Sequence, residues 1–328
     1  MPQELRLGTR GSQLALWQAH AVASRIAAAG GPPCRIVPIK TSGDRLQAAP
    51  LSEFGGKRLF VKEIEEALIN ADIDLAVHSS KDMPAALPEG LTIAGVLPRE
   101  DPLDAVVLPA SRPLMNRLND VVKLIAELGQ SPRIGTGSVR RVAQIKRILP
   151  HAFFKPIRGN LDSRLRKLDD GEFDALVLAS AGLRRLGFDE RISLRLPARC
   201  SVPAPGQGIV AIQIREDDAA VLRVVGSIND AGAAAELRAE RAVVEALGGG
   251  CQTPIGALAT SGSAGDIELV AVVISLDGSR AISGSARGSR SEAAAIGARV
   301  GAQLIADGAG DILADARHAA GASEGIQP

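Results

Sequence analysis

Basic side chains are concentrated in one stretch of this sequence. Residues 131–200 contain 15 Lys and Arg against 7 Asp and Glu, whereas the whole chain of 328 residues has a formal net charge of +1. Five arginines of this stretch lie at or just after predicted turns: Arg140, Arg141, Arg158, Arg164 and Arg185. Any one of them would equally suit a solvated basic face. As a set they favour a ligand with several carboxylates or phosphates, because a guanidinium binds such groups at two points.

Two Gly-Thr turns each stand between a predicted strand and a predicted helix. The first turn contains Arg10 and Ser12, and the second contains Thr136 and Ser138. Both serines are placed as helix N-caps, and the free amides of a helix N-terminus bind anions readily. The two turns therefore predict two similar anion-binding loops.

One carboxylate, Asp82, follows Lys81 at the end of a predicted strand and precedes Met83-Pro84. An aspartate before a proline turn is in most cases only a turn former. A carboxylate that faces an anion-binding cleft would repel the ligand, so its presence there suggests proton transfer or stabilisation of a cation. The residues alone leave both interpretations open.

The three cysteines are spaced too widely for a disulfide framework or a zinc site. Cys34 and Cys200 are expected to pack in the core, as free cysteines usually do. Cys251 differs because glycines 248–250 precede it, and such a loop exposes a sulfur and admits a bulky group. The sequence alone supports two interpretations of Cys251 equally, a functional thiol and a buried cysteine. The sequence contains no metal-ligand cluster, Walker A motif or Rossmann glycine pattern.

Three other features carry little functional signal by themselves. His78 is more typical of a histidine hydrogen-bonded into the fold than of a catalytic base. Residues 101–104 (Asp-Pro-Leu-Asp) have the composition of an ordinary turn, and Gly206-Gln207-Gly208 is a weak motif by itself.

The elements that position these residues alternate between strands and helices. Strands are predicted at 5–7, 35–40, 73–78, 133–135, 153–157 and 173–178, and helices at 14–26, 61–69, 142–149 and 161–168. The two halves resemble each other in motif order, so we expect two similar α/β lobes, with mainly parallel sheets, that face each other across a cleft. Ligands of such sheets bind beyond the carboxyl ends of the strands, where both Gly-Thr turns and Asp82 lie.

A third unit is predicted after residue 226. Helices at 233–247 and 291–305 enclose a hairpin of strands 267–276 and 280–286, which is typical of a small α+β domain. Hydrophobic residues make up 46% of the chain and aromatic residues 2%. Residues Met1–Arg6 are unlike a signal peptide and no apolar run is long enough to span a membrane, so we expect a cytoplasmic protein.

Six motifs together resemble the porphobilinogen deaminase family, over a stretch from Leu5 to about Ala314. They are Gly55-Gly56-Lys57 with Leu59–Glu63, Ala76–Pro84, Gly135–Arg141, Arg158-Gly159-Asn160, Pro205–Gly208 and Gly249–Gly256. The resemblance implies lobes like those of two-domain solute-binding proteins, with a return of the chain to the first lobe before the third domain. The expected domains are a first lobe at 1–108 and 204–226, a second lobe at 109–203, a third domain at 227–320 and a tail at 321–328.

The resemblance also implies an enzyme, a transferase of tetrapyrrole, porphyrin and haem biosynthesis. In this family a dipyrromethane cofactor, made by the enzyme itself, is attached by a thioether to a loop cysteine, which is Cys251 here. Each porphobilinogen loses ammonia to give an azafulvene, which the free α-carbon of the growing chain attacks. Four additions and a hydrolysis release hydroxymethylbilane. Every ring carries an acetate and a propionate, in agreement with an arginine-rich cleft.

The resemblance assigns Asp82 as the catalytic carboxylate. The residues implied to bind the cofactor are Cys251 (covalently), Lys81, Thr136, Ser138, Arg140, Arg141, Arg164 and Arg185. Those implied to bind substrate are Arg10, Ser12, Lys57, Phe60, Arg158 and Gln207. No metal is implied, and we expect a monomer that binds neither nucleic acid nor a membrane. Departures from the family pattern at Arg58, Gly137 and Gly248 concern the loops and some cofactor contacts.

Two other classes of protein have some support. A non-enzymatic two-lobed receptor for a polyanion agrees with the paired lobes, but Asp82, Cys251 and the third domain oppose it. A nucleic-acid binder would use the basic stretch, but the chain has few aromatic side chains on which bases could stack.

Overall fold

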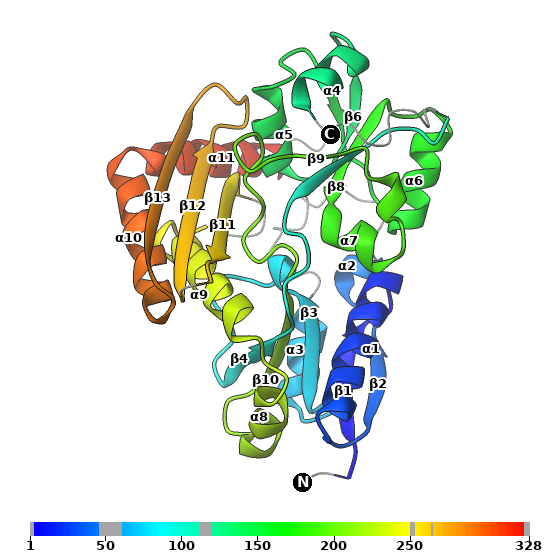
Figure 1. Cartoon of the computed structure of the whole chain (residues 1–328), viewed down its shortest axis with the longest axis vertical. Coiled ribbons are helices and arrows are strands. Elements are labelled where there is room, and N and C mark those ends of the chain that lie inside the picture. Colours follow the sequence, from blue (N-terminus) through cyan, green and yellow to red (C-terminus); the bar gives the residue numbers. More distant parts are fainter. Residues whose placement is uncertain (1–2, 46–60, 112–119, 250–252, 264, 325–328) are drawn as a thin grey trace.

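The first lobe is built on a five-stranded sheet (Figure 1). The structure is a computed structural model that describes residues 3–45, 61–111, 120–249, 253–263 and 265–324. The strands of this sheet lie in the order β2 (Cys34–Ile39), β1 (Leu5–Arg10), β3 (Leu75–Ser79), β10 (Val210–Arg215) and β4 (Leu91–Val96). The helices of the lobe are α1 (Gln13–Ala28), α2 (Ser42–Arg45), α3 (Lys62–Ile69) and α8 (Ala219–Gly226).

The second lobe repeats this topology. Its strands lie in the order β7 (Phe153–Lys155), β6 (Arg133–Gly135), β8 (Ala175–Ala179), β5 (Asp104–Val107) and β9 (Leu194–Arg195). Its helices are α4 (Val121–Leu128), α5 (Val139–Lys146), α6 (Leu161–Asp169) and α7 (Ser180–Arg185). In each sheet the fourth strand, β10 or β5, runs antiparallel to both of its neighbours, so both sheets are mainly parallel as expected.

The two lobes also repeat one ion pair. Arg6 donates to Asp74 from its backbone nitrogen, Nε and a terminal nitrogen at 2.7, 3.1 and 2.6 Å. Arg133 donates to Asp174 in the same way at 2.7, 3.1 and 2.8 Å. Each pair joins the second strand in the order of its sheet, β1 or β6, to the segment that leads into the third strand, β3 or β8. The repeated sequence pattern therefore has a repeated structural counterpart.

Each Gly-Thr turn begins at a glycine because the adjoining side chains leave no space. A Cβ on Gly8 would lie 2.3 Å from Ile73 Cδ1, and one on Gly135 would lie 2.4 Å from Leu176 Cδ2. Real Cβ atoms do not approach other atoms so closely, so a larger residue at Gly8 or Gly135 would displace the buried side chain of Ile73 or Leu176.

Two connections join the lobes and run beside each other. The first comprises residues 97–103 and the second residues 196–209. Glu100 N donates to Gly208 O at 3.0 Å, and Arg99 Nε donates to Gln207 O at 2.9 Å. The first connection delivers β5 to the second sheet, so residues 104–108 lie with the second lobe and not with the first, where we expected them. The second connection returns the chain to the first sheet as β10, between β3 and β4, in agreement with the expected return at residues 204–226. The correction at 104–108 concerns a strand whose partners lie far away in sequence.

The third domain packs a three-stranded antiparallel sheet against helices (Figure 1). Its elements are α9 (Ala231–Ala246), β11 (Ile255–Ser261), β12 (Asp266–Ile274), β13 (Ala281–Ser289), α10 (Ala293–Ala306) and α11 (Ala309–Glu324). The predicted tail at 321–328 begins too early, because α11 continues to Glu324. The alanine-rich sequence of this segment has a high helix propensity, which explains the extension.

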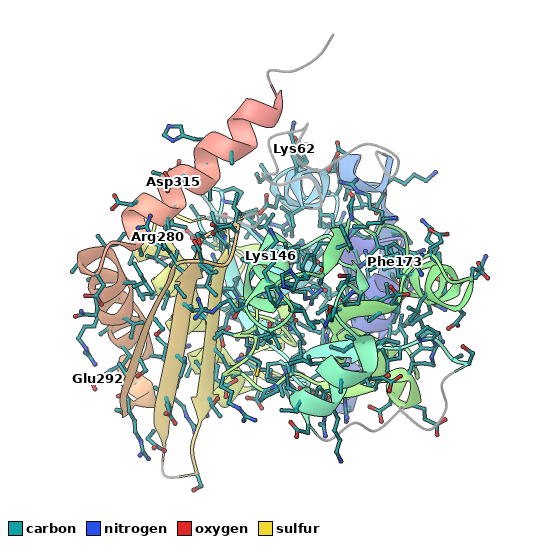
Figure 2. The ribbon with its side chains drawn as sticks, turned by 90° about the horizontal axis from the view of Figure 1, so that it is seen from above. Lys62, Lys146, Phe173, Arg280, Glu292 and Asp315 are labelled. Atoms are coloured by element: carbon teal, nitrogen blue, oxygen red, sulfur yellow. The ribbon has the colours of Figure 1, made fainter. Side chains whose placement is uncertain are left out.

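The third domain is bound to both lobes. Arg99, in the first connection, donates to Glu240 at 2.6 Å and to Glu236 at 3.2 Å on α9. The turn between β12 and β13 lies on α5, where Lys146 Nζ donates to Leu276 O at 3.5 Å and Arg147 donates to Gly278 O at 3.2 Å (Figure 2). At the same end of the hairpin, Arg280 faces Asp315 of α11 at 3.8 Å (Figure 2).

Candidate active site

The expected site residues lie at the carboxyl ends of the strands, where the lobes meet. Lys81 and Asp82 form the short turn Ser80–Asp82 after β3, and Arg10 is the last residue of β1. Ser138 caps α5 after β6 and accepts from Arg141 N at 3.4 Å, while Ser12 caps α1 and accepts from Ala15 N at 3.3 Å. Both predicted N-caps are confirmed, and the two helices begin at the same place in each lobe.

Lys81 of the first lobe lies close to charged groups of the second. Burial lowers the pKa of Lys81 to about 8; Arg141 and Arg140 contribute to the lowering, whereas Asp82 and Asp104 oppose it. These effects act across the junction, because Lys81 follows β3 while both arginines belong to α5. The structure therefore brings Lys81 and the α5 arginines together, as expected.

Asp82 lies half-buried among cations from both lobes. Its negative charge acts on Lys81, on Arg141 and on Arg164. Arg164, on α6, also donates from Nε to Gly159 O at 2.8 Å, which holds it against the Arg158-Gly159-Asn160 turn. Asp82, the residue for which we expected a role in proton transfer, therefore lies among basic side chains of both lobes.

Positive charge exceeds negative charge in this region. Burial lowers the pKa of Arg164, and the neighbouring Arg141 and Arg158 add to the effect. Burial also lowers the pKa of Arg185 to about 10 and lowers that of Arg141 despite the attraction of Asp104. Cations whose pKa values are lowered in this way gain free energy when an anion binds, because the anion favours their charged form.

Arg140 and Arg141 are buried in a network around one carboxylate, Asp104. Arg140 donates to Asp104 at 2.8 and 3.1 Å and to Val202 O at 2.6 Å. Arg141 donates to Asp104 at 2.9 Å and to Val177 O at 3.1 Å. The two arginines hold the pKa of the fully buried Asp104 carboxyl well below its ordinary value, although burial opposes them.

Gln207 closes this network from the opposite side. Its Oε1 accepts from Arg141 at 3.2 Å, and its Nε2 donates to Pro102 O at 2.6 Å and to Asp104 at 3.0 Å. The side chain is fully buried. The expected role of Gln207 in binding substrate stays a prediction, and the structure shows it joining the two connections.

Three further expected residues have partners within the protein. Arg10 forms an ion pair of 2.5 Å with Asp44 of α2. Thr136 is buried and its Oγ1 accepts from Ser138 N at 3.3 Å. Arg185 donates to Gly208 O at 2.7 Å and lies 5.6 Å from the ring centre of Trp17, so it joins α7 of the second lobe to the first lobe.

Three expected site residues, Lys57, Phe60 and Cys251, lie outside the described residues, and so does the departure at Arg58. Cys34 is half-buried and packs against the core of the first lobe, as expected, whereas Cys200 is only half-buried. His78 is buried and bonds to Gln213 at 3.0 Å, and burial lowers its pKa to about 4. It is thus hydrogen-bonded into the fold, as expected.

Asp104 is a site residue that the turn-like composition of residues 101–104 conceals. Its position directly before the apolar run Ala105–Leu108 is a usable signal, because a carboxylate beginning a buried strand requires a cationic partner. Arg99 and Glu240 were not predicted to pair, and they lie 141 residues apart in the chain. Such a pairing leaves no local pattern.

Other kinds of site find no support among the described residues. No described helix is long and apolar enough to cross a membrane. Within the same residues, no group of three or more His, Cys, Asp or Glu side chains could hold a metal ion. A cavity of about 540 Å³ lies between β4 and α9, and its lining includes none of the expected site residues.

Two lobes that surround one aspartate with lysine and arginine, joined to a third domain, define a protein that binds and transforms an anionic ligand between its lobes. Residues 5–223 match the family model described as porphobilinogen deaminase, dipyromethane cofactor binding domain. Residues 234–306 match the model described as porphobilinogen deaminase, C-terminal domain. The chain belongs to the porphobilinogen deaminase family.

Curated relatives agree over nearly the whole length. The chain is 42% identical over 315 residues to the porphobilinogen deaminase of Geotalea daltonii, covering 95% of each chain. It is 43% identical over 315 residues to that of Geobacter metallireducens, covering 96% of this chain and 95% of the relative. The solved structure of the periplasmic aliphatic sulphonate binding protein SsuA from Escherichia coli has 12% identity and a TM-score of 0.38, over 75% of this chain and 70% of that one. That score is too low to support an inference.

Proposed function

We infer that this protein joins four porphobilinogen molecules head to tail, with loss of ammonia, into hydroxymethylbilane on a covalently bound dipyrromethane primer. This is transferase chemistry of tetrapyrrole, porphyrin and haem biosynthesis. The family match over both parts of the chain supports the inference. In the structure, the observation that carries it is the group of cations around Asp82, namely Lys81 from the first lobe and Arg141 and Arg164 from the second, on each of which the charge of Asp82 acts. Each pyrrole ring bears an acetate and a propionate, and these carboxylates would pair with the cations.

The residues between the lobes fit a carboxylate-rich cofactor. Arginine and lysine donors, together with two serine-capped helices, form a set suited to carboxylates. When bound, the dipyrromethane supplies the free pyrrole α-carbon to which the first substrate is joined. We propose that Cys251 is its point of attachment and that it is held by the following residues: Lys81, Thr136, Ser138, Arg140, Arg141, Arg164 and Arg185.

We propose that Asp82 is the catalytic carboxylate. One of its oxygens accepts and returns a proton during the reaction, and its negative charge balances the cation that develops on the reacting pyrrole. Its place between the cations of both lobes supports this role, since a ligand held by those cations lies against it. Substrate carboxylates are proposed to bind at Arg10, Ser12, Arg158, Gln207, Lys57 and Phe60 or beside them.

The remaining parts of the proposal concern the whole protein. We propose that it consists of the two lobes and the third domain described above and that it acts as a cytoplasmic monomer. No nucleic acid or membrane is part of its function. Light scattering of the purified protein tests the oligomeric state, for which a mass of one chain is expected.

Incubation of the purified protein with porphobilinogen tests the function. We expect release of ammonia and of a linear tetrapyrrole that cyclises without enzyme to a porphyrin precursor. A non-enzymatic polyanion receptor would bind porphobilinogen and leave it unchanged, and this result would overturn the proposal.

A further inference from the structure

The buried carboxylate of Asp104 makes more contacts than a turn former requires. It begins β5 in the second lobe, yet it accepts from Arg140 and Arg141 of α5, from Ser201 Oγ at 2.8 Å and from Gln207. These donors come from one helix and from the second connection between the lobes. Asp104 is therefore the common partner of the elements that meet at the junction.

The network of Asp104 extends to the proposed catalytic turn. Gln207, which donates to Asp104, is flanked by Gly206, and Gly206 packs directly on the turn Ser80–Asp82. A Cβ on Gly206 would lie 2.5 Å from Ser80 Oγ and 3.2 Å from Lys81 N. The segment that carries Gln207 therefore lies close against the turn that carries Lys81.

The charges of this network do not balance without a ligand. Two guanidinium groups share one carboxylate, and Arg140 Nε is buried with no hydrogen-bond acceptor among the described residues. Asp104 compensates one of the two charges and fixes the direction of both side chains. Asp82 also acts on Arg141, but its charge is shared with Lys81 and Arg164, so positive charge remains for an anion that enters between the lobes.

We propose that Asp104 is a positioning residue, which fixes Arg141 and Arg140 relative to Lys81 and Asp82 so that they meet the carboxylates of cofactor and substrate. This inference rests on the proposed function. Asp104 itself touches neither cofactor nor substrate and acts only through the arginines and Gln207.

The variant Asp104→Asn tests this role, because it keeps the shape of the side chain and removes its charge. We expect KM for porphobilinogen to rise about tenfold to a hundredfold, the range expected for loss of a hydrogen bond to a charged group, with a smaller change in kcat. We also expect a larger fraction of the purified protein without cofactor, measured as intact mass.

The control is Asp174→Asn, which removes the carboxylate from the Arg133–Asp174 pair of the same lobe. That pair lies before the first residue of β8, whereas Asp104 lies beside its last residue, Ala179. We expect this variant to unfold at a lower temperature with KM unchanged. If Asp104→Asn behaves in the same way, Asp104 is only structural and the inference is overturned.

A milder variant covers the case in which Asp104→Asn does not fold. Ser201→Ala removes one donor to Asp104 and leaves every charge in place. We expect KM to rise about threefold or more, and an unchanged KM would overturn the inference. A wild-type protein that does not consume porphobilinogen would instead contradict the proposed function, and the inference with it.

Discussion

At the scale of single residues, the central assignment is that of Asp82. We expect Asp82→Asn to fold and bind porphobilinogen but to lose about 10²–10⁴ in kcat, because the amide can neither accept a proton at neutral pH nor balance a cation. Steady-state kinetics and thermal unfolding of the variant and the wild type measure the two effects. Near-normal kcat in the folded variant would refute the assignment.

Lys81 predicts a pH dependence. Its pKa in the folded protein is about 8, below the ordinary 10.5, so it is charged below pH 8 and loses its charge above that pH. Because the charged form attracts the carboxylates of the cofactor, loading of cofactor-free protein, measured as intact mass, should decrease as the pH rises above about 8. In Lys81→Arg this decrease should be displaced to higher pH, since an arginine keeps its charge. A decrease that is the same in both proteins would show that another group is responsible.

The pairing of Arg140 and Arg141 with Asp104 shows which part of the site could not be predicted from the sequence. Arg140 and Arg141 were recognised as ligand-binding candidates, and the structure places them at the junction of the lobes. Their partner Asp104 begins an apolar run, which signals a buried carboxylate, but its pairing with these two arginines could not be predicted because they lie 36 and 37 residues away. Burial of two adjacent arginines is possible only with this carboxylate, which is a tertiary fact without a local signature.

At the scale of elements, the local patterns predicted the strands that precede the Gly-Thr turns and the helices that follow them. Ser12 and Ser138 were identified as caps because a serine before an apolar helical stripe is a local signal. Strands β5 and β10 were not predicted, since each sits in a sheet beside strands distant in sequence. The apolar runs of both strands are short and could not be assigned to a sheet by periodicity.

The hairpin between β12 and β13 supplies a prediction at this scale. Gly278 has a φ of +80°, and a Cβ there would lie 2.8 Å from Ala143 O of α5. Gly265 has a φ of +79° with nothing within 4 Å of such a Cβ, so it is a matched control. Both valine variants should lose about 1–3 kcal/mol to backbone strain, and Gly278→Val should lose more because it also clashes with α5.

Chemical denaturation of the two variants measures this difference. Equal losses of unfolding free energy in Gly278→Val and Gly265→Val would mean that the hairpin is not held against α5. A larger loss in Gly278→Val supports the contact by which the third domain meets the helix that carries Arg140 and Arg141.

At the scale of the whole molecule, the sequence repeat predicted two similar lobes, and the structure shows the same strand order in both. The placement of the lobes relative to each other could not be predicted, because it depends on contacts such as that of Arg185 with Trp17 and Gly208. These residues lie on different lobes and share no sequence pattern.

Trp17 makes the contact between the lobes measurable, since it is the single tryptophan of the chain. Replacing Arg185 by Ala removes the cation 5.6 Å from its ring and should shift its fluorescence emission to longer wavelength as water gains access. Arg184→Ala is the control, because Arg184 pairs with Glu100 and Asp189 instead. The same emission in both variants would contradict the contact.

The most direct test of the whole account is the intact mass of the purified protein, compared with that of Cys251→Ser, Cys34→Ser and Cys200→Ser. A dipyrromethane attached to Cys251 predicts a mass excess equal to two linked pyrroles in the wild type and in the Cys34 and Cys200 variants, and no excess in Cys251→Ser. Peptide mapping should place the adduct on the peptide that contains Cys251, since an accessible thiolate is the nucleophile that the attachment needs. An adduct on Cys34 or Cys200, or a normal mass excess in Cys251→Ser, would contradict the account.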